Sequence, residues 1–116
     1  MTETAADCLF CRIVAGEIPA TVVAETEHSF AFRDIAAQAP THVLVVPRRH
    51  VPDAASLAAV SAAELADMVT LAARVAAEEG LEGYRLVANT GAAAQQTVFH
   101  AHLHVLGGRE LTWPPG

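Results

Sequence analysis

Three histidines alternate with apolar residues near the end of the chain, in residues 98–106 (VFHAHLHVL). This period of two is typical of a strand with one buried face. We therefore expect Ala101, Leu103 and Val105 to face the core and the three imidazoles to line the other side. Alternate side chains on a strand are rooted ~6.6–6.8 Å apart. Two such rings can converge on one metal ion, but three on a straight strand cannot easily do so, and we expect their roles to differ.

A purification tag or a solvated polar face would also bring several histidines together. A tag is a terminal run of adjacent histidines, whereas these alternate with core residues inside an apolar segment. Histidine titrates near neutrality and can act as a base, an acid, a nucleophile or a ligand. Three histidines in register therefore favour a functional site.

The composition restricts the class of protein. The 116 residues suffice for a single domain, residues 1–116, with a proper core. The formal net charge is −6, with 7 arginines and no lysine. This balance argues against a polymeric nucleic acid as partner, and the absence of lysine excludes lysine-based covalent catalysis. A mononucleotide stays open as a ligand, because backbone N–H groups and histidine can hold its phosphate.

Neither a membrane span nor a signal peptide is indicated. The sequence has no uninterrupted run of strongly apolar residues that reaches the roughly 18 needed for a span. Residues 1–4 (MTET) are acidic and lack the basic start of a signal peptide. We expect a cytoplasmic protein.

Five strands and two helices are predicted. Besides the histidine segment, four segments have the β-branched or apolar composition of strands: residues 21–25, 29–33, 42–47 and 84–89. A short helix over residues 7–16 is capped by Asp7 and stopped by Gly16. A long helix over residues 61–79 opens with the Ser-Ala-Ala-Glu spacing of a capping box, after an alanine-rich helical region. One long and one short helix with these strands predict an α+β fold around a mostly antiparallel five-stranded sheet.

Cys8 and Cys11 are the only cysteines. A thioredoxin-like redox motif would follow a strand, and only seven residues precede Cys8. A structural disulfide is not expected in the cytoplasm, while two cysteines on a helix can simply be core residues. The spacing also suits zinc, which needs two further nitrogen or sulfur ligands. His50, just past a strand end, and His100 are placed to supply them.

The end of the chain carries a recognisable pattern. Residues 100–106 (HAHLHVL) resemble the signature of the histidine triad (HIT) superfamily, His-φ-His-φ-His-φ-φ with φ apolar. Residues 107–109 (GGR) and 113–116 (WPPG) resemble the ending of its Hint branch of nucleoside phosphoramidases. Upstream segments also fit this family: residues 32–35 (FRDI), 39–42 (APTH), 89–91 (NTG) and 96–98 (QTV). The resemblance covers almost the whole chain from Cys8 and implies a HIT-like fold.

The resemblance implies roles for the matching residues. His102 would be the nucleophile that takes up the nucleotidyl group. His104 and Thr97 would contact the phosphate and the departing amine, and His42 would support the triad. Nucleotide binding is implied for Phe10, Phe32, Asp34, Ile35, Leu44, Asn89, Gln96, Thr97, Val98, His102, His104 and Trp113. Some bacterial relatives carry zinc on a Cys-x-x-Cys pair and two histidines, which implies a structural Zn²⁺ on Cys8, Cys11, His50 and His100.

The implied activity is hydrolysis of the P–N bond of purine nucleoside 5′-phosphoramidates through a nucleotidyl-histidine intermediate, with AMP- or GMP-type ligands. Such a nucleophile needs its second ring nitrogen fixed by an acceptor, and a backbone carbonyl does this without adding charge. The poor amine leaving group needs a donor beside it. Two alternatives stay open: a dinucleotide polyphosphate hydrolase of another HIT branch, and a nucleotide-binding regulatory module with vestigial hydrolysis.

Gln95 departs from the family pattern, which usually has glycine there, in a loop that approaches the phosphate. Glycine serves close backbone approach or a positive φ, so glutamine raises the question of the local loop shape and of the catalytic rate.

Trp113 is the only tryptophan and lies beyond the last strand. An aromatic ring with no core of its own more often serves an interface. In Hint proteins the matching tryptophan reaches the neighbouring subunit's pocket; the alternative is packing on its own sheet edge. We expect a homodimer in which residues 84–89 and 61–79 of two copies meet and form a ten-stranded sheet.

Overall fold

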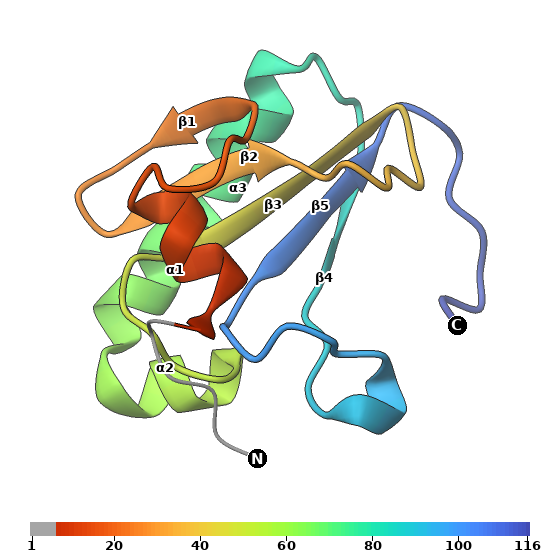
Figure 1. Ribbon diagram of the computed structural model, residues 1–116. Coiled ribbons are helices and arrows are strands. Elements are labelled where there is room, and N and C mark those ends of the chain that lie inside the picture. Colours follow the sequence, from red (N-terminus) through yellow and green to blue (C-terminus); the bar gives the residue numbers. More distant parts are fainter. Residues whose placement is uncertain (1–6) are drawn as a thin grey trace.

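The computed structural model describes residues 7–116 as an antiparallel five-stranded sheet with helices on both faces (Figure 1). The strand order across the sheet is β1-β2-β3-β5-β4, and each neighbouring pair is antiparallel. The strands are β1 (Val22–Glu25), β2 (Ser29–Arg33), β3 (Thr41–Pro47), β4 (Tyr84–Val87) and β5 (Leu103–Gly107). The predicted α+β class and the predicted strands are confirmed, with bounds that differ by one or two residues for β1, β3 and β4.

The central strand β3 is buried along its whole length. Val43 and Val45 face one side of the sheet and pack in the main core cluster. Leu44 and Val46 face the other side and pack against the short helix α1. A strand covered on both faces reads as a continuous apolar run, which is why residues 43–46 (VLVV) carry no polar alternation.

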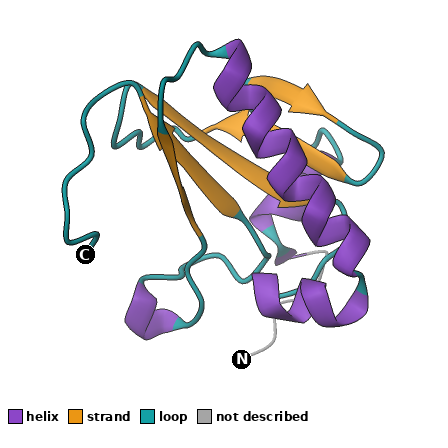
Figure 2. Ribbon diagram, turned by 180° about the vertical axis from the view of Figure 1, so that it is seen from behind, coloured by secondary structure: helices purple, strands orange, loops and turns teal. Residues whose placement is uncertain are grey.

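Of the three α-helices in the described residues, two cover the faces of the sheet and the third packs mainly against the longer of these two. The long helix α3 (Ala62–Glu78) lies across one face, as Figure 2 shows, and its Met68 and Val75 belong to the main core. The short helix α1 (Leu9–Val14) lies on the opposite face. The alanine-rich region forms a further helix, α2 (Ala54–Val60), so the structure has one helix more than the predicted pair.

Most of the predicted helix caps and stops are confirmed. The hydroxyl of Ser61 accepts a hydrogen bond from the Glu64 N–H at 3.2 Å, as the capping box predicts. Gly16 and Gly80 adopt positive φ at the predicted helix stops. The prediction that Asp7 caps α1 was wrong: the cap is Cys8, whose Sγ accepts a hydrogen bond from the Cys11 N–H at 3.3 Å.

The histidine segment is a strand only in its second half. β5 begins at Leu103, so His100 and His102 precede it. The pairing of β3 with β5 stops at Val45 and Leu103, because Pro47 has no N–H to donate to the preceding segment, and the backbone N–H of Ala101 instead donates to the Val51 carbonyl at 2.8 Å. The alternation itself is confirmed, because Ala101, Leu103 and Val105 all lie in the main core cluster.

No helix within residues 7–116 combines the length and the apolarity that crossing a bilayer requires.

Gln95 adopts the left-handed conformation, with φ of 68° and ψ of 28°, at the end of the 3₁₀ helix η2 (Ala92–Ala94). The structure therefore keeps the backbone shape for which glycine is suited, with a residue that bears a Cβ. A non-glycine residue in this region costs roughly 1–2 kcal/mol.

We predict that Gln95→Gly raises the free energy of unfolding by up to about 1 kcal/mol, because relief of the left-handed strain exceeds the roughly 0.5–1 kcal/mol entropic cost of glycine. Gln95→Val should lower it, since β-branched residues tolerate positive φ least. Denaturant unfolding measures both variants. A Gln95→Gly protein that is clearly less stable than the wild type would contradict this account.

Candidate functional site

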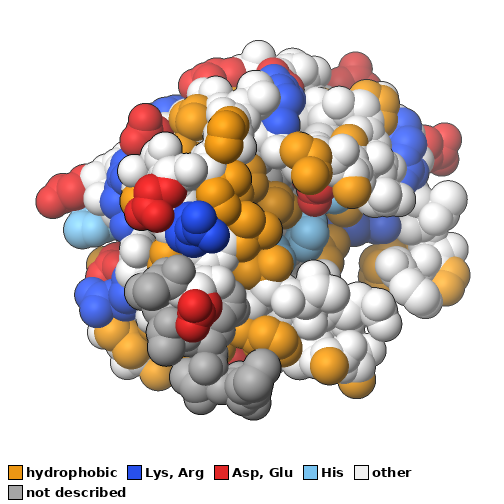
Figure 3. Space-filling view, viewed as in Figure 1, with side chains coloured by type: hydrophobic (Ala, Val, Ile, Leu, Met, Phe, Trp, Pro, Cys, Tyr) orange, Lys and Arg blue, Asp and Glu red, His pale blue; other side chains and the backbone are white. Residues whose placement is uncertain are grey.

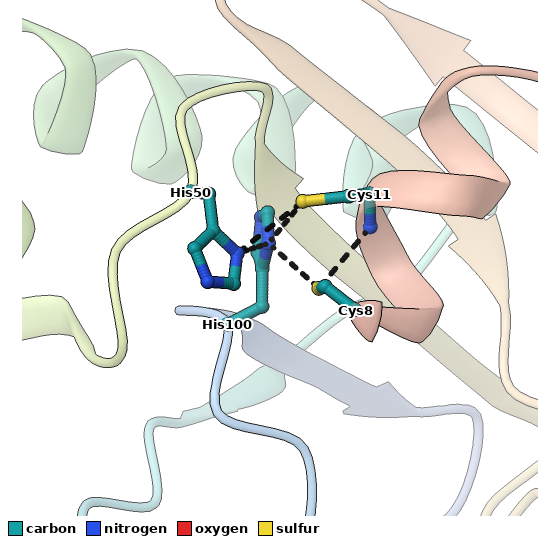
Figure 4. Close-up of side chains that lie close together, drawn as sticks. All are labelled: Cys8, Cys11, His50 and His100. Atoms are coloured by element: carbon teal, nitrogen blue, oxygen red, sulfur yellow. Dashed lines mark hydrogen bonds between the residues drawn. The ribbon is translucent and has the colours of Figure 1, made fainter. Parts of the chain in front are cut away.

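Four side chains converge between the start of α1 and the end of β3 (Figure 4). The Sγ of Cys8 lies 3.3 Å from His100 Nδ1, and the Sγ of Cys11 lies 3.3 Å from His50 Nδ1. The two Nδ1 atoms are 3.2 Å apart, and no disulfide joins the two cysteines. Two sulfur and two nitrogen donors around one centre form a Cys₂His₂ set, and this cluster could bind a metal ion in tetrahedral geometry.

His100 is oriented as a ligand by the backbone. It is fully buried, and its Nε2–H donates to the Pro47 carbonyl at 2.7 Å. A carbonyl can only accept, so in the neutral ring the proton sits on Nε2 and the Nδ1 lone pair faces the cysteines. Burial lowers the pKa of His100 to about 4. A ligating histidine characteristically donates its other N–H to such an acceptor, so the residues fit a metal site.

A second cluster joins Asp34, His42 and His104 on the same face of the sheet. His42 Nε2 lies 2.9 Å from His104 Nδ1 and 3.4 Å from Asp34 Oδ2. The backbone N–H of Gln38 donates to His42 Nδ1 at 3.0 Å. The proton of neutral His42 must therefore sit on Nε2, from which it is donated to His104 Nδ1. His104 in turn carries its own proton on Nε2.

This hydrogen-bond chain argues against a second metal site. A metal on His42 Nε2 would move the ring proton to Nδ1, where it would oppose the N–H of Gln38. The arrangement instead fixes His104 as a hydrogen-bond donor at Nε2. Burial, together with the neighbouring His102 and His42, lowers the pKa of His104 to about 4, so the ring stays neutral at physiological pH.

His102 is the opposite tautomer to His104: it carries its proton on Nδ1. Its Nδ1–H donates to the His100 carbonyl at 2.7 Å, which leaves an unprotonated Nε2. Burial lowers the pKa of His102 as well. Its ring packs edge-on against Phe10, with ring centroids 5.0 Å apart, and lies 5.1 Å from the ring of His104. The expectation that a backbone carbonyl fixes this histidine is confirmed.

These two histidines line a mostly apolar cavity of about 300 Å³. Figure 3 shows apolar side chains around a hollow on this face, with histidine visible inside it. The structure brings together nine of the residues implied in nucleotide binding: Phe10, Phe32, Asp34, Ile35, Leu44, Thr97, Val98, His102 and His104. The cavity has six further lining residues that the sequence did not predict: Leu9, Ile13, Ile18, Pro19, Ala20 and Arg33. Leu9 and Ile13 were detectable, because they share one face of α1 at a spacing of four residues.

Three implied binding residues and His42 do not line this cavity. The amide of Gln96 is buried and bonds to the backbone alone, accepting from the Gly91 N–H at 2.8 Å and donating to the Pro52 and Val98 carbonyls. Gln96 thus fastens the loop that carries Thr97. Asn89 is half-buried, and the Trp113 side chain is 80% exposed.

A larger hollow of about 660 Å³ lies elsewhere, between residues 80–85 and residues 108–111. No histidine, cysteine or aspartate lines it. Size alone would favour it as a ligand site, but the smaller cavity holds the oriented imidazoles, and we take that one as the candidate site.

Comparisons with known proteins agree with this geometry. The family model of the HIT domain matches residues 15–111. The chain belongs to the HIT domain family. It is 48% identical to an uncharacterised HIT-like protein of Synechococcus elongatus, over 95% of this chain and 97% of that one.

Solved structures give the same result for this HIT protein. A HIT family hydrolase from Clostridium thermocellum superposes with a TM-score of 0.89 at 40% identity, covering 94% of this chain and 96% of that one. A HIT family hydrolase from Legionella pneumophila superposes equally well at 50% identity, covering 94% and 99%. The HIT-like fold implied by the sequence is confirmed.

The lowered pKa values predict acid sensitivity. Between pH 6.5 and 4 the unfolded chain protonates His104 while the folded chain does not, so the free energy of unfolding should fall as the pH decreases. A tenfold difference in proton affinity corresponds to about 1.4 kcal/mol, and because the His104 ring is only partly buried, solvent screening reduces its share to about 1–2 kcal/mol over this range.

Urea unfolding at about pH 7 and about pH 5 measures this loss. His104→Asn, which cannot titrate, should show a smaller loss than the wild type. An equal loss in the two proteins would contradict the assignment to His104.

Proposed function

We propose that this HIT protein is a nucleotide-binding hydrolase that cleaves the P–N bond of purine nucleoside 5′-phosphoramidates. The observation that carries the proposal is the pairing of opposite tautomers at the cavity: His102 presents a lone pair at Nε2, and neighbouring His104 presents a proton at Nε2. A nucleophile beside a donor is what nucleotidyl transfer to histidine requires. The names of the two solved HIT family hydrolases agree with a hydrolytic reaction.

In the proposed reaction, His102 Nε2 attacks the phosphorus and the P–N bond to the amine breaks. The electron pair leaves with the amine nitrogen, which takes a proton from a water molecule. The resulting hydroxide attacks the same phosphorus, the bond between phosphorus and Nε2 breaks, and a nucleoside monophosphate leaves. Splitting the substitution in this way replaces one difficult step by two easier ones.

His104 and Thr97 would act on the charge that develops during this transfer. Both line the cavity beside His102. A fixed N–H and a hydroxyl donate to phosphoryl oxygens without reorganisation, which is the main way enzymes stabilise such charge. The apolar part of the cavity, around Phe32 and Leu44, suits a flat purine ring, and Asp34 at its edge suits the ribose hydroxyls.

Removal of the nucleophile tests this proposal. His102→Ala should lower kcat for an adenosine phosphoramidate by at least about 10³-fold, because a covalent catalyst is lost, and should still bind AMP. The exposed His28 supplies a matched control, and His28→Asn should leave kcat unchanged. A kcat of His102→Ala close to that of the wild type would contradict the proposal.

The same assay with diadenosine polyphosphates in parallel separates the proposed activity from its rivals. Faster cleavage of the dinucleotides would identify a dinucleotide polyphosphate hydrolase. Nucleotide binding without turnover of either substrate would identify a regulatory module.

The proposal includes a structural Zn²⁺ on Cys8, Cys11, His50 and His100. Bound there, zinc supplies a cross-link between α1 and the sheet, since four protein ligands leave no open position for substrate. Thiolate ligation and the absence of a disulfide suit a reducing compartment, and a cytoplasmic location is part of the proposal.

Metal analysis should find about one zinc per chain. Cys8→Ser should lose it and lower Tm by roughly 5–15 °C, because about 2 kcal/mol shifts the midpoint of a domain of this size by that amount. His28→Asn should keep both the zinc and the Tm. A metal-free wild type with the same Tm as Cys8→Ser would contradict the zinc assignment.

We further propose a homodimer formed through edge strand β4. β4 pairs only with β5 among the described strands, and its Tyr84 is 41% exposed. Pairing of this edge with a second copy about a two-fold axis would cover it and extend the sheet to ten strands. Trp113 lies near this edge, with its ring 5.9 Å from Arg85 Cζ, and its exposed ring would reach the partner subunit's pocket.

Trp113→Ala should leave AMP affinity and zinc content nearly unchanged, while the preference among phosphoramidates with different amines shifts by about tenfold, as for loss of one apolar contact. Trp113→Phe, which keeps an aromatic ring, should shift it less. Sedimentation should show a wild-type dimer. A fully active monomer, or an unaltered substrate profile in Trp113→Ala, would contradict this proposal.

A further inference from the structure

His100 connects the Cys8–Cys11–His50–His100 cluster with the cavity that His102 lines. Its ring presents Nδ1 to Cys8, Cys11 and His50 at 3.2–3.4 Å. Its backbone carbonyl accepts the Nδ1–H of His102 at 2.7 Å. The group that would bind the metal and the group that sets the tautomer of the nucleophile are thus parts of one residue.

Phe10 makes a second connection. It lies on α1 between the two cysteines, and it is 5% exposed. Its ring packs edge-on against His102 with centroids 5.0 Å apart, and against His100 with centroids 6.0 Å apart. Any movement of α1 away from His50 and His100 would also withdraw the wall against which His102 rests.

The sheet itself does not hold His102. β5 begins one residue later, at Leu103, whose partner in β3 is Val45, so the pairing between the two strands stops before His102. The backbone around His102 is held by the Ala101–Val51 and His100–Pro47 hydrogen bonds and by the cluster. A misplacement of about 1 Å can cost about 100-fold in rate. The position of the His102 ring therefore matters for the rate, and it depends on contacts outside the regular strand pairing.

We propose that the Cys8–Cys11–His50–His100 centre, when it holds its metal, positions the nucleophile: it keeps the His100 carbonyl on the Nδ1–H of His102 and the Phe10 ring against the His102 imidazole. This inference rests on the proposed function, in which His102 attacks phosphorus. In this proposal the four ligands raise kcat as well as the stability of the fold, although none of them lines the nucleotide cavity. His50 and Phe10 are positioning residues in this scheme.

The test uses His50→Asn, because His50 contacts the cluster and does not line the nucleotide cavity. Nitrogen-15 NMR of the imidazoles at about pH 8, where neutral rings dominate, reports the tautomer of His102. The wild type with zinc should show the Nδ1–H form alone. His50→Asn should lose zinc, show both tautomers, and lower kcat by about 10- to 100-fold, as losses of supporting contacts do.

Two matched variants sharpen this result. His50→Cys restores a fourth ligand, and zinc accepts a Cys₃His set, so it should recover zinc, the single tautomer and most of kcat. His28→Asn removes an exposed histidine outside the site and should change none of these readouts. A merely structural role of the metal would lower Tm in His50→Asn but leave the tautomer and kcat as in the wild type, and that result would overturn the proposal.

Phe10→Leu keeps all four ligands and therefore decides the question if His50→Asn does not fold. It should retain zinc and show a mixed His102 tautomer with reduced kcat. Retained zinc with an unchanged tautomer would overturn the proposal. Because the tautomer is read without substrate, a wild type that hydrolyses no phosphoramidate would defeat the proposed function while leaving this comparison valid.

Discussion

A single hydrogen bond, from the Nδ1–H of His102 to the His100 carbonyl, determines what the site can do. It commits the proton of the ring to one nitrogen and leaves the other as a lone pair. The same principle holds for each oriented histidine in the site. His100 gives its Nε2–H to the Pro47 carbonyl, and His42 accepts the Gln38 N–H at Nδ1. Backbone groups thus set three tautomers, and the remaining nitrogen of each ring is available for ligation, attack or donation.

Neutral rings are essential to this arrangement. His42 and His104 lie 2.9 Å apart between ring nitrogens, and His50 and His100 lie 3.2 Å apart. Two charged imidazoles at such distances would repel each other strongly in a buried site. Burial lowers the pKa of His42, His100, His102 and His104, and this favours the uncharged form of these four rings. Burial therefore explains both why these imidazoles can pack so closely and why their unprotonated nitrogens are available for attack or ligation.

The short helix α1 depends on tertiary contacts. Its six residues are far below the length at which an isolated helix is stable in water. It is held by the apolar cluster that includes Phe10, Phe30 and Phe32, and by the approach of Cys8 and Cys11 to the two histidines. Since Phe10 also walls the cavity, whatever stabilises α1 also shapes the site.

The sequence by itself determined the periodic features. The alternation through Ala101, Leu103 and Val105 marked the buried face of the histidine segment, and the capping box and Gly80 marked the two ends of the long helix. These signals are local, because a strand or a helix imposes its period on neighbouring residues. The Cys-x-x-Cys spacing and the places of His50 and His100 likewise indicated the four side chains that converge in the structure, and the resemblance supplied the roles implied for the three alternating histidines.

Only the tertiary structure decided how the histidines divide their work. His42 and His104 are 62 residues apart in sequence, and the partners of their tautomer chain include the backbone of Gln38. Gln96 resembled a phosphate-side residue, but its amide bonds to two backbone groups of its own loop, at Gly91 and Val98, and to the carbonyl of Pro52 in a distant loop. The start of β5 at Leu103 depended on Pro47 of the neighbouring strand, which has no N–H to donate to the preceding segment. Hydrogen bonds between distant segments leave no period in the sequence, because any residue has a backbone N–H or carbonyl to offer and only the fold brings a particular one within reach.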